Sequence, residues 1–335
     1  MSVTIHDVAK HAGVSIATVS RVLNDSASVL EEKRVRVLAA AEALGYSPNP
    51  AALSLLNKQT GGIGVLLPFV QGEFFSELIG GLDEAAQEHG RFLVISSSHR
   101  QTGEFRKAIQ VLDKRVDGLV VMAPELDVRG AASLLATETP VVFINTYTEG
   151  LAADVFNFDN YQGGYLLTRH LLDAGHRKIA LLHGPPHAQD AIERARGYRE
   201  AMAEAGVSNT RDLEFDGGYT REAGHAAAVA VLARKPRPTA IVAANDHCAT
   251  GVVSALLREG VRVPDQMSVT GFDGLESSRY VVPPLTTVSV PVREIGRQAA
   301  LRLFARLRGE PLELEQRFVP VQLVVRESTS LRETT

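Results

Sequence analysis

The chain has 335 residues, a net charge of −4, 45% apolar residues and a single cysteine. This length exceeds what one small core needs and predicts two or three domains. No apolar run reaches about 18 residues, so no membrane-spanning helix is predicted. The lone Cys248 excludes an internal disulfide framework and a multi-cysteine zinc site. The N-terminus has no apolar signal core, so we expect a cytoplasmic protein.

The first segment, Thr4 to Asn24, reads TIHDVAKHAGVSIATVSRVLN and predicts two short helices joined by a tight turn. Thr4 and Asp7 have the spacing of a capping box, which marks the start of the first helix. Gly13 permits the sharp turn, because it carries no side chain to obstruct it. Ser15 is placed to cap the second helix. This arrangement predicts that the second helix lies in a DNA major groove.

A third helix is expected from about residue 30 to 44, ended by Gly45, with Val37, Ala41 and Leu44 on its inner face. Residues 1–46 would then form a small independent unit. Through Thr60 the chain has six basic and five acidic residues, a net charge of +1. A headpiece with so small a positive charge makes few strong ion pairs with DNA phosphates. We therefore expect two copies to bind a symmetric site.

Residues 47–60 separate this unit from the rest. Ser47-Pro48-Asn49-Pro50 interrupts helical structure, because proline blocks a helix and restricts its predecessor. The next residues, 51–57, are helix-capable, and 58–62 are polar and glycine-rich. We therefore expect a short hinge helix followed by a linker.

From Ile63 onward, strand and helix patterns alternate. Strands are expected at Ile63–Phe69, Phe92–Ser96, Gly118–Met122, Val141–Ile144, Lys178–His183, Ala240–Ala244 and Met267–Phe272. Helices are expected at Phe74–Glu88, Glu104–Lys114, Gln162–Ala174, Ile192–Ala205, Glu222–Ala233 and Thr250–Glu259. This rhythm is typical of doubly wound α/β folds, and so many strands favour two lobes. A ligand would bind between the lobes, where parallel strands end.

Several motifs, in order along essentially the whole chain, resemble the LacI/GalR family of bacterial transcription regulators. They are the opening helix-turn-helix, GYSPNPAA, GHRKIALLHGP with R-x-x-G-Y after it, AANDHCATG, and SVTGFDGLESSRYVVPPLTTV. The resemblance implies an all-α headpiece (1–46), a hinge helix and linker (47–60), and a homodimeric effector-binding domain (61–335). That domain is an α/β two-lobed, periplasmic-binding-protein-like (type I) sensor with doubly wound parallel sheets. Lobe 1 would span about 61–159 and 291–319, and lobe 2 about 160–290 and 320–330.

The resemblance also implies which residues contact DNA. They are Ser15, Ile16, Ala17, Thr18, Ser20, Arg21, Asn24, Asn49 and Leu55. Ile16 and Ala17 can touch a thymine methyl, and Arg21 can form a bidentate pair with guanine. The short polar residues suit phosphate contacts. The alternative is a plain three-helix bundle with a solvated Arg21.

Leu55 aligns with a family leucine that wedges into the minor groove and kinks the DNA. Its alternative role is to pack against the dimer mate or the sensor. Leu53 and Leu56 stand where arginines are common in the family, so this hinge binds phosphate less well. Leu30 likewise stands where the family often has a capping serine.

The effector-binding residues implied by the family and by strand ends are Phe74, Phe75, Asn145, Arg194, Tyr219, Asn245 and Asp273. Planar polar side chains and aromatic rings are the groups that recognise sugars. An Asp or Asn at a strand end can instead cap the next helix, and this alternative stays open for Asn245, Asp246 and Asp273. We expect one of the two adjacent phenylalanines to belong to the core. Arg196 is expected to be a surface or interlobe residue, and Val290 removes one hydroxyl partner that some members have.

An enzyme is the third-ranked interpretation. The chain has no dinucleotide fingerprint, no phosphate-binding loop and no nucleophile elbow. His183 and His187 have metal-like spacing but no acidic or cysteine partner nearby in sequence. We therefore predict no catalytic residues, no metal and no cofactor.

The prediction is a ligand-responsive repressor of carbohydrate-metabolism genes that binds a palindromic double-stranded operator as a homodimer. Its effector would be a sugar or sugar derivative. The runner-up is a soluble sugar-binding protein without regulatory DNA binding.

Overall fold

The computed structural model describes residues 3–23, 29–46, 59–99, 102–147, 150, 152–207 and 209–332. The chain divides into two compact units, one ending at Gly61 and the other beginning at Gly62. Within the described ranges, no helix is both long and apolar enough to cross a membrane.

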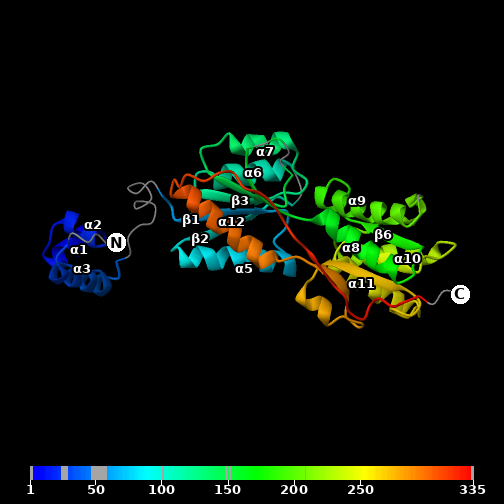
Figure 1. Ribbon diagram of the computed structural model, residues 1–335. Coiled ribbons are helices and arrows are strands. Elements are labelled where there is room, and N and C mark those ends of the chain that lie inside the picture. The colour runs from blue at the N-terminus through cyan, green and yellow to red at the C-terminus, as the bar shows by residue number, and fades with distance from the viewer. Residues whose placement is uncertain are drawn as a thin grey trace. The chain divides into compact units, whose positions relative to one another are not determined.

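The N-terminal unit consists of three helices, α1 (Ile5–Ala12), α2 (Ile16–Leu23) and α3 (Glu31–Leu44) (Figure 1). Their shared core is made of small and β-branched residues: Val8, Ala9, Ala12, Val19, Val22, Val37, Ala40 and Ala41. The Thr4 backbone N–H donates to the Asp7 carboxylate at 2.9 Å, which confirms the predicted capping box.

The turn between α1 and α2 is held from the third helix. Gly13 has a φ of 64°, in the left-handed region that favours glycine. The Arg36 guanidinium of α3 donates to the Ala12 carbonyl at this turn. Ser15 then accepts a hydrogen bond from the Thr18 N–H at 3.2 Å, which confirms it as the cap of α2. Leu30 makes no side-chain cap for α3, as its apolar side chain requires.

The second unit has two lobes, each built on a six-stranded sheet. In lobe 1 the strand order is β11-β5-β4-β3-β1-β2 and all pairs are parallel. The strands are β1 (Gly62–Leu67), β2 (Phe92–Ser97), β3 (Gly118–Met122), β4 (Val141–Ile144), β5 (Asp154–Phe158) and β11 (Gln316–Val319). Helices α5 (Glu73–Glu88) and α12 (Val292–Leu307) cover one face. Helices α6 (Thr102–Leu112) and α7 (Val128–Leu135) cover the other.

Lobe 2 repeats this plan with the strand order β12-β10-β9-β8-β6-β7. Its strands are β6 (Ile179–His183), β7 (Glu214–Asp216), β8 (Ala240–Val242), β9 (Ser268–Asp273), β10 (Thr286–Ser289) and β12 (Gln322–Val324). Only the β10–β12 pair is antiparallel among these. Helices α8 (Asn160–Asp173) and α9 (Gln189–Glu204) cover one face. Helices α10 (Arg221–Ala233) and α11 (Asp246–Arg258) cover the other, and η1 (Arg211–Leu213) and η2 (Glu276–Arg279) are short 3-10 turns.

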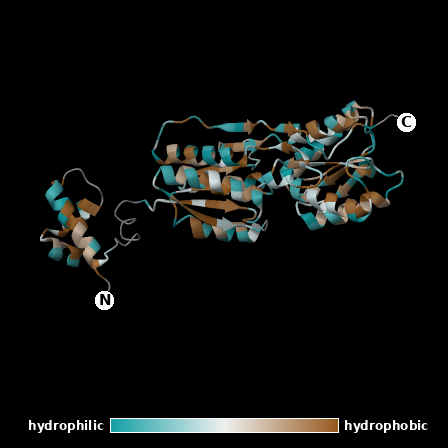
Figure 2. Cartoon of the chain, turned by 90° about the horizontal axis from the view of Figure 1, so that it is seen from below, coloured by the Kyte–Doolittle hydropathy of each residue, from teal (hydrophilic) through white to brown (hydrophobic). Residues whose placement is uncertain are grey.

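The predicted doubly wound α/β fold is confirmed. Most of the strands are hydrophobic, and hydrophilic residues lie on the outer faces of the surrounding helices (Figure 2). The chain passes between the lobes three times, after β5, after β10 and after β11. The parallel strands of each sheet end toward the other lobe, so the loops that follow these strands line the space between the lobes.

Candidate functional site

The outward face of α2 carries most of the residues expected to read DNA. Ser15, Ile16, Ala17 and Arg21 are exposed, with Ile16 at 41% of its maximal accessible surface. Val19 and Val22, on the opposite face, are buried in the core. The first turn of the helix and Arg21 therefore form one accessible surface.

The polar members of this set differ in their surroundings. Thr18 and Ser20 are half-buried. The exposed Ser15 hydroxyl accepts from the Thr18 N–H as the helix cap, and it lies 2.9 Å from the Thr18 hydroxyl. Three predicted DNA contacts, Asn24, Asn49 and Leu55, lie outside the described residues, as do Leu53 and Leu56.

A cleft of about 720 Å³ lies between the two lobes. All seven predicted effector residues line it: Phe74, Phe75, Asn145, Arg194, Tyr219, Asn245 and Asp273. The phenylalanines begin α5 of lobe 1, and Asn145 follows β4. The other four come from lobe 2. The size suits a small metabolite.

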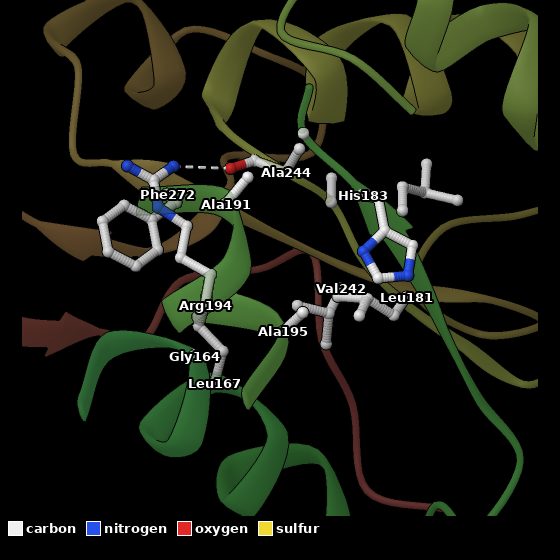
Figure 3. Close-up of a pocket in the computed structure, with 13 residues that line it drawn as sticks. Gly164, Leu167, Leu181, His183, Ala191, Arg194, Ala195, Val242, Ala244 and Phe272 are labelled. Atoms are coloured by element: carbon white, nitrogen blue, oxygen red, sulfur yellow. Dashed lines mark hydrogen bonds between the residues drawn. The ribbon is translucent and has the colours of Figure 1, made fainter. Parts of the chain in front are cut away.

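Arg194 is fixed at the floor of the cleft by three interactions. Its Nε donates to Asn160 Oδ1 at 3.0 Å, and Nη1 donates to the Ala244 carbonyl at 2.7 Å. Its Cζ lies 3.6 Å from the centre of the Phe272 ring. Figure 3 shows the guanidinium held between this ring and the Ala244 carbonyl. The cavity drawn there has a volume of about 10 Å³, room for about one water molecule.

Asp273 faces the remaining edge of Arg194, with 3.8 Å between Oδ1 and Nη2. Burial raises the pKa of Asp273 well above its usual value, and the neighbouring Asp246 and Asp190 raise it further, against the opposing effect of Arg194. The backbone φ of Asp273 is 113°, a strained conformation for a residue with a side chain. Strain of this kind costs about 1–3 kcal/mol and concentrates at ligand sites.

Asn145 is the second strained residue at the floor, with a φ of 43°. Its side chain accepts from Asn160 Nδ2 at 3.1 Å and donates to Asp190 Oδ2 at 3.3 Å. The buried Asn160 side chain therefore connects Asn145 of lobe 1 to Arg194 of lobe 2.

Aromatic rings form the walls. Phe74 and Phe75 meet edge to face with ring centres 5.3 Å apart, and Phe74 packs against Phe158 at 5.9 Å. Both are half-buried, both pack against the hydrophobic core and both line the cleft, so the expectation that one of them belongs to the core is wrong. Tyr219 lies on the opposite lobe, with its ring centre 5.5 Å from Arg194 Cζ.

Asn245 acts as the cap of α11. Its Oδ1 accepts from the Cys248 N–H at 2.8 Å, and its Nδ2 donates to the Tyr219 carbonyl at 3.4 Å. Asn245 therefore caps the next helix, which is the alternative that the sequence left open, and it also lines the cleft. Asp246 does not cap the helix. It accepts from Thr287 Oγ1 at 2.6 Å and from the Leu275 N–H at 2.8 Å, behind Asp273.

The cleft also contains residues that the sequence did not single out. Asp190 is 4% exposed and lies in the first turn of α9, four residues before Arg194. The i, i+4 spacing places both on one helix face, a signal that could have identified Asp190. Glu73, Arg221, Glu222 and His247 lie around the mouth.

The residues considered for chemistry have structural roles. His183 Nε2 lies 2.8 Å from Glu214 Oε2, an acidic partner that is not nearby in sequence but is brought by β7 from 31 residues further along the chain. The described residues contain no group of three or more His, Cys, Asp or Glu arranged for a metal. Cys248 is buried, which raises its pKa to about 11. Arg196 is paired with Glu193 on the surface, as expected.

Both the helical headpiece and the two-lobed domain match known protein families. Residues 4–49 match the profile of bacterial regulatory proteins of the lacI family, and residues 168–329 match a periplasmic binding protein-like domain. The HTH-type transcriptional repressor PurR of Photobacterium profundum is 37% identical over 97% of this chain and 98% of its own length. The chain belongs to the lacI family. The regulator DegA of Bacillus subtilis is another such relative, 34% identical over 98% of this chain and 99% of its own length.

Solved structures agree with this lacI-family assignment. The lac repressor dimer bound to operator and the anti-inducer ONPF matches with a TM-score of 0.90 and 31% identity, covering 98% of this chain and 100% of that one. A complex of the regulator CelR with cellobiose matches with a TM-score of 0.74 and 30% identity, covering 97% and 99%. The protein is therefore a ligand-responsive, DNA-binding transcriptional repressor of the lacI family.

Proposed function

We propose that this lacI-family repressor binds a palindromic operator as a homodimer, and that a carbohydrate in the interlobe cleft controls its affinity for DNA. The observation that carries the proposal is the cleft itself, whose floor presents a buried, oriented arginine and whose walls are aromatic. The same chain carries an exposed reading helix.

In the proposed complex, the first turn of α2 contacts base edges. Arg21 forms a bidentate pair with guanine, worth about 1–3 kcal/mol of discrimination, while Ile16 and Ala17 touch thymine methyl groups. The remaining proposed contacts are polar residues to phosphate, Ser15, Thr18, Ser20, Asn24 and Asn49, and the minor-groove wedge Leu55.

The cleft chemistry favours a ring with several hydroxyl groups. Arg194, Asn145 and Asp273 offer planar polar edges that can bond adjacent hydroxyls in pairs. Phe74, Phe75 and Tyr219 offer faces for the C–H side of the ring. The solved relatives include complexes with cellobiose and with ribose, which are sugars. A flat heterocycle would also fit between aromatic walls of opposite lobes, so nucleobases belong in any ligand screen.

Exposed apolar side chains supply a surface for the proposed homodimer. Phe92 and Ile95 on the edge strand β2 are 54% and 41% exposed, and Tyr280 and Val282 of lobe 2 are 74% and 77% exposed. Large exposed apolar side chains gathered on one element typically mark protein–protein contacts. We propose that both lobes contribute to the dimer.

Contacts between the lobes supply the proposed control. Asn145 of lobe 1 bonds to Asp190 of lobe 2, and Glu73 Oε1 accepts from the Ser277 N–H at 3.1 Å. A ligand that bonds to both lobes changes their relative angle, and with it the spacing of the two hinge segments in the dimer. The coupling is reciprocal, so operator binding changes ligand affinity by the same factor.

The test begins with selection of bound sequences from a random DNA pool by the full chain. We expect a palindromic site, and we expect some sugar from a panel of sugars and nucleobases to change its affinity. Selection of no preferred sequence, together with sugar binding, would favour the runner-up, a sugar-binding protein without regulatory DNA binding.

A further inference from the structure

Two buried carboxyl groups, those of Asp190 and Asp273, line the cleft beside the Arg194 guanidinium, and a third, that of Asp246, lies near Asp273 outside the lining. Asp190, Asp246 and Asp273 are 4%, 1% and 6% exposed. Arg194 lies 3.8 Å from Asp273 and also interacts with Asp190, and the charge of Arg326 acts on Asp246. Taken together, these groups give the floor an excess of acidic side chains.

Arg194 has little capacity left for an anion. Its Nε is committed to Asn160, its Nη1 to the Ala244 carbonyl, and its flat face to the Phe272 ring. The edge that remains, at Nη2, points toward Asp273. An anionic ligand group approaching this edge would therefore meet a carboxyl group at the same place.

Asp190 contributes the charge that faces this point from the start of α9. Its Oδ1 accepts from the Ala191 N–H at 2.8 Å, and its Oδ2 accepts from Asn145 Nδ2 at 3.3 Å. Both hydrogen-bond partners are neutral, so they orient the carboxylate without cancelling its charge, which Arg194 opposes at longer range. Asp190 also lines the cleft directly.

The charged side chains around the mouth of the cleft do not outweigh the acidic side chains of its floor. Glu73 and Glu222 lie there with Arg221 and His247. Burial lowers the pKa of His247, and the nearby Arg221 lowers it further against the effect of Glu73, so its surroundings disfavour the charged imidazole.

We propose that the cleft accepts a ligand that is uncharged or cationic where it meets the floor and rejects anionic relatives such as sugar phosphates and sugar acids, with Asp190 as the residue that sets this preference. This inference rests on the proposed ligand-controlled cleft. A like charge about 5 Å away, at an effective dielectric constant of about 20, disfavours binding on the order of a hundredfold.

The experiment uses inorganic phosphate as the anionic probe, measured by isothermal titration with the full-length protein at constant ionic strength. Asp190→Asn keeps the shape and removes the charge, and Asp212→Asn removes the same charge from a site where the side chain is 71% exposed. We expect phosphate to bind the Asp190→Asn variant at least about tenfold more tightly than the wild type. The Asp212→Asn control should match the wild type.

Two results would overturn the inference: equal phosphate affinity in the wild type and Asp190→Asn, or phosphate binding to neither protein. Asp190→Ser, which also removes the charge, replaces Asp190→Asn if circular dichroism shows that the latter is misfolded.

A second experiment separates this inference from the proposed function. It measures the release of the repressor from operator DNA by glucose, glucosamine, glucuronate and glucose 6-phosphate. Release of wild-type repressor by an anionic form in preference to its neutral parent would overturn the inference and leave ligand control standing. Failure to bind operator would overturn the proposed function, while the phosphate comparison would still decide the inference.

Discussion

The guanidinium of Arg194 lies flat on the ring of Phe272, with 3.6 Å between Cζ and the ring centre. Phe272 belongs to β9, and the next residue of that strand is Asp273. One strand therefore supplies both the ring that orients the arginine and the carboxyl group that faces its free edge. The floor of the cleft is made by this contact between α9 and β9.

Replacing Arg194 by lysine should abolish most of the ligand response and spare DNA binding. A lysine keeps the charge but cannot stack flat on Phe272 while donating to two acceptors in one plane. We expect ligand affinity to fall by about tenfold or more. Calorimetric titration with the ligand found in the screen measures this, and Arg196→Lys, two residues away and paired with Glu193, should behave as the wild type. Unchanged affinity in Arg194→Lys would exclude this arginine from the site.

Replacing Gly164 by alanine should destabilise lobe 2. A Cβ at this position of α8 would lie 2.1 Å from the Arg194 carbonyl oxygen of α9, so the two helices would have to separate. Overpacking of this kind costs about 1–3 kcal/mol, which urea unfolding can detect. Gly103→Ala, in α6, meets nothing within 4 Å and should be neutral or slightly stabilising. Equal stability of the two variants would contradict the close approach of α8 and α9.

The stability of the protein should depend on Glu214 at neutral pH and lose that dependence in acid. Burial raises the pKa of Glu214, but hydrogen bonds from Arg199, Thr210 and His183 lower it more strongly, from 4.5 to about 2. The folded protein thus holds fewer protons than the unfolded chain between these values. The stabilisation is complete above about pH 4.5 and is lost as the pH falls through 2.

We expect Glu214→Gln to lower the free energy of unfolding by about 1 kcal/mol at pH 7, because the ion pair is partly screened by water. The difference from the wild type should shrink steadily below pH 4.5. Urea unfolding at several pH values measures it, with the exposed Glu310→Gln as the control. A difference that stays constant with pH would show that ionisation of Glu214 is not responsible.

Replacing Arg21 by lysine should weaken specific DNA binding more than non-specific binding. Lysine retains the charge for phosphate attraction but cannot form the bidentate pair with guanine. We expect a loss of about 1–3 kcal/mol on the selected operator, with an unchanged slope of affinity against salt concentration. Filter-binding measurements on operator and scrambled DNA separate the two contributions. An equal loss on both DNAs would assign Arg21 to phosphate contact only.

Local patterns were sufficient for the head and for most of the strands. The capping box at Thr4, the turn at Gly13 and the cap at Ser15 are short-range features, and all are present. The sequence did not identify β5, with the mixed sequence DVFNF, or the short strands β7, β10, β11 and β12. All of them except β7 flank a crossing between the lobes, and all of them pair with segments distant in sequence, which no local pattern encodes.

Errors at helix starts explain what was missed in the site. Helix α9 was expected from Ile192 but begins at Gln189, which places Asp190 in its first turn, on the cleft. Helix α11 was expected from Thr250 but begins at Asp246, which makes Asn245 its cap. Both starts follow a strand within a few residues, where tertiary packing decides the boundary. The residues that directly follow strands were located correctly, because parallel strands end at one edge of a sheet.

The most direct test of ligand control is the fluorescence anisotropy of a labelled operator palindrome titrated with full-length protein, with and without the sugar found in the screen. For the wild type we predict a shift in operator affinity of about 5- to 150-fold, the usual range of such coupling. For Arg194→Lys we predict the same operator affinity and almost no shift. An operator affinity that no ligand alters, or an equal shift in both proteins, would contradict the account.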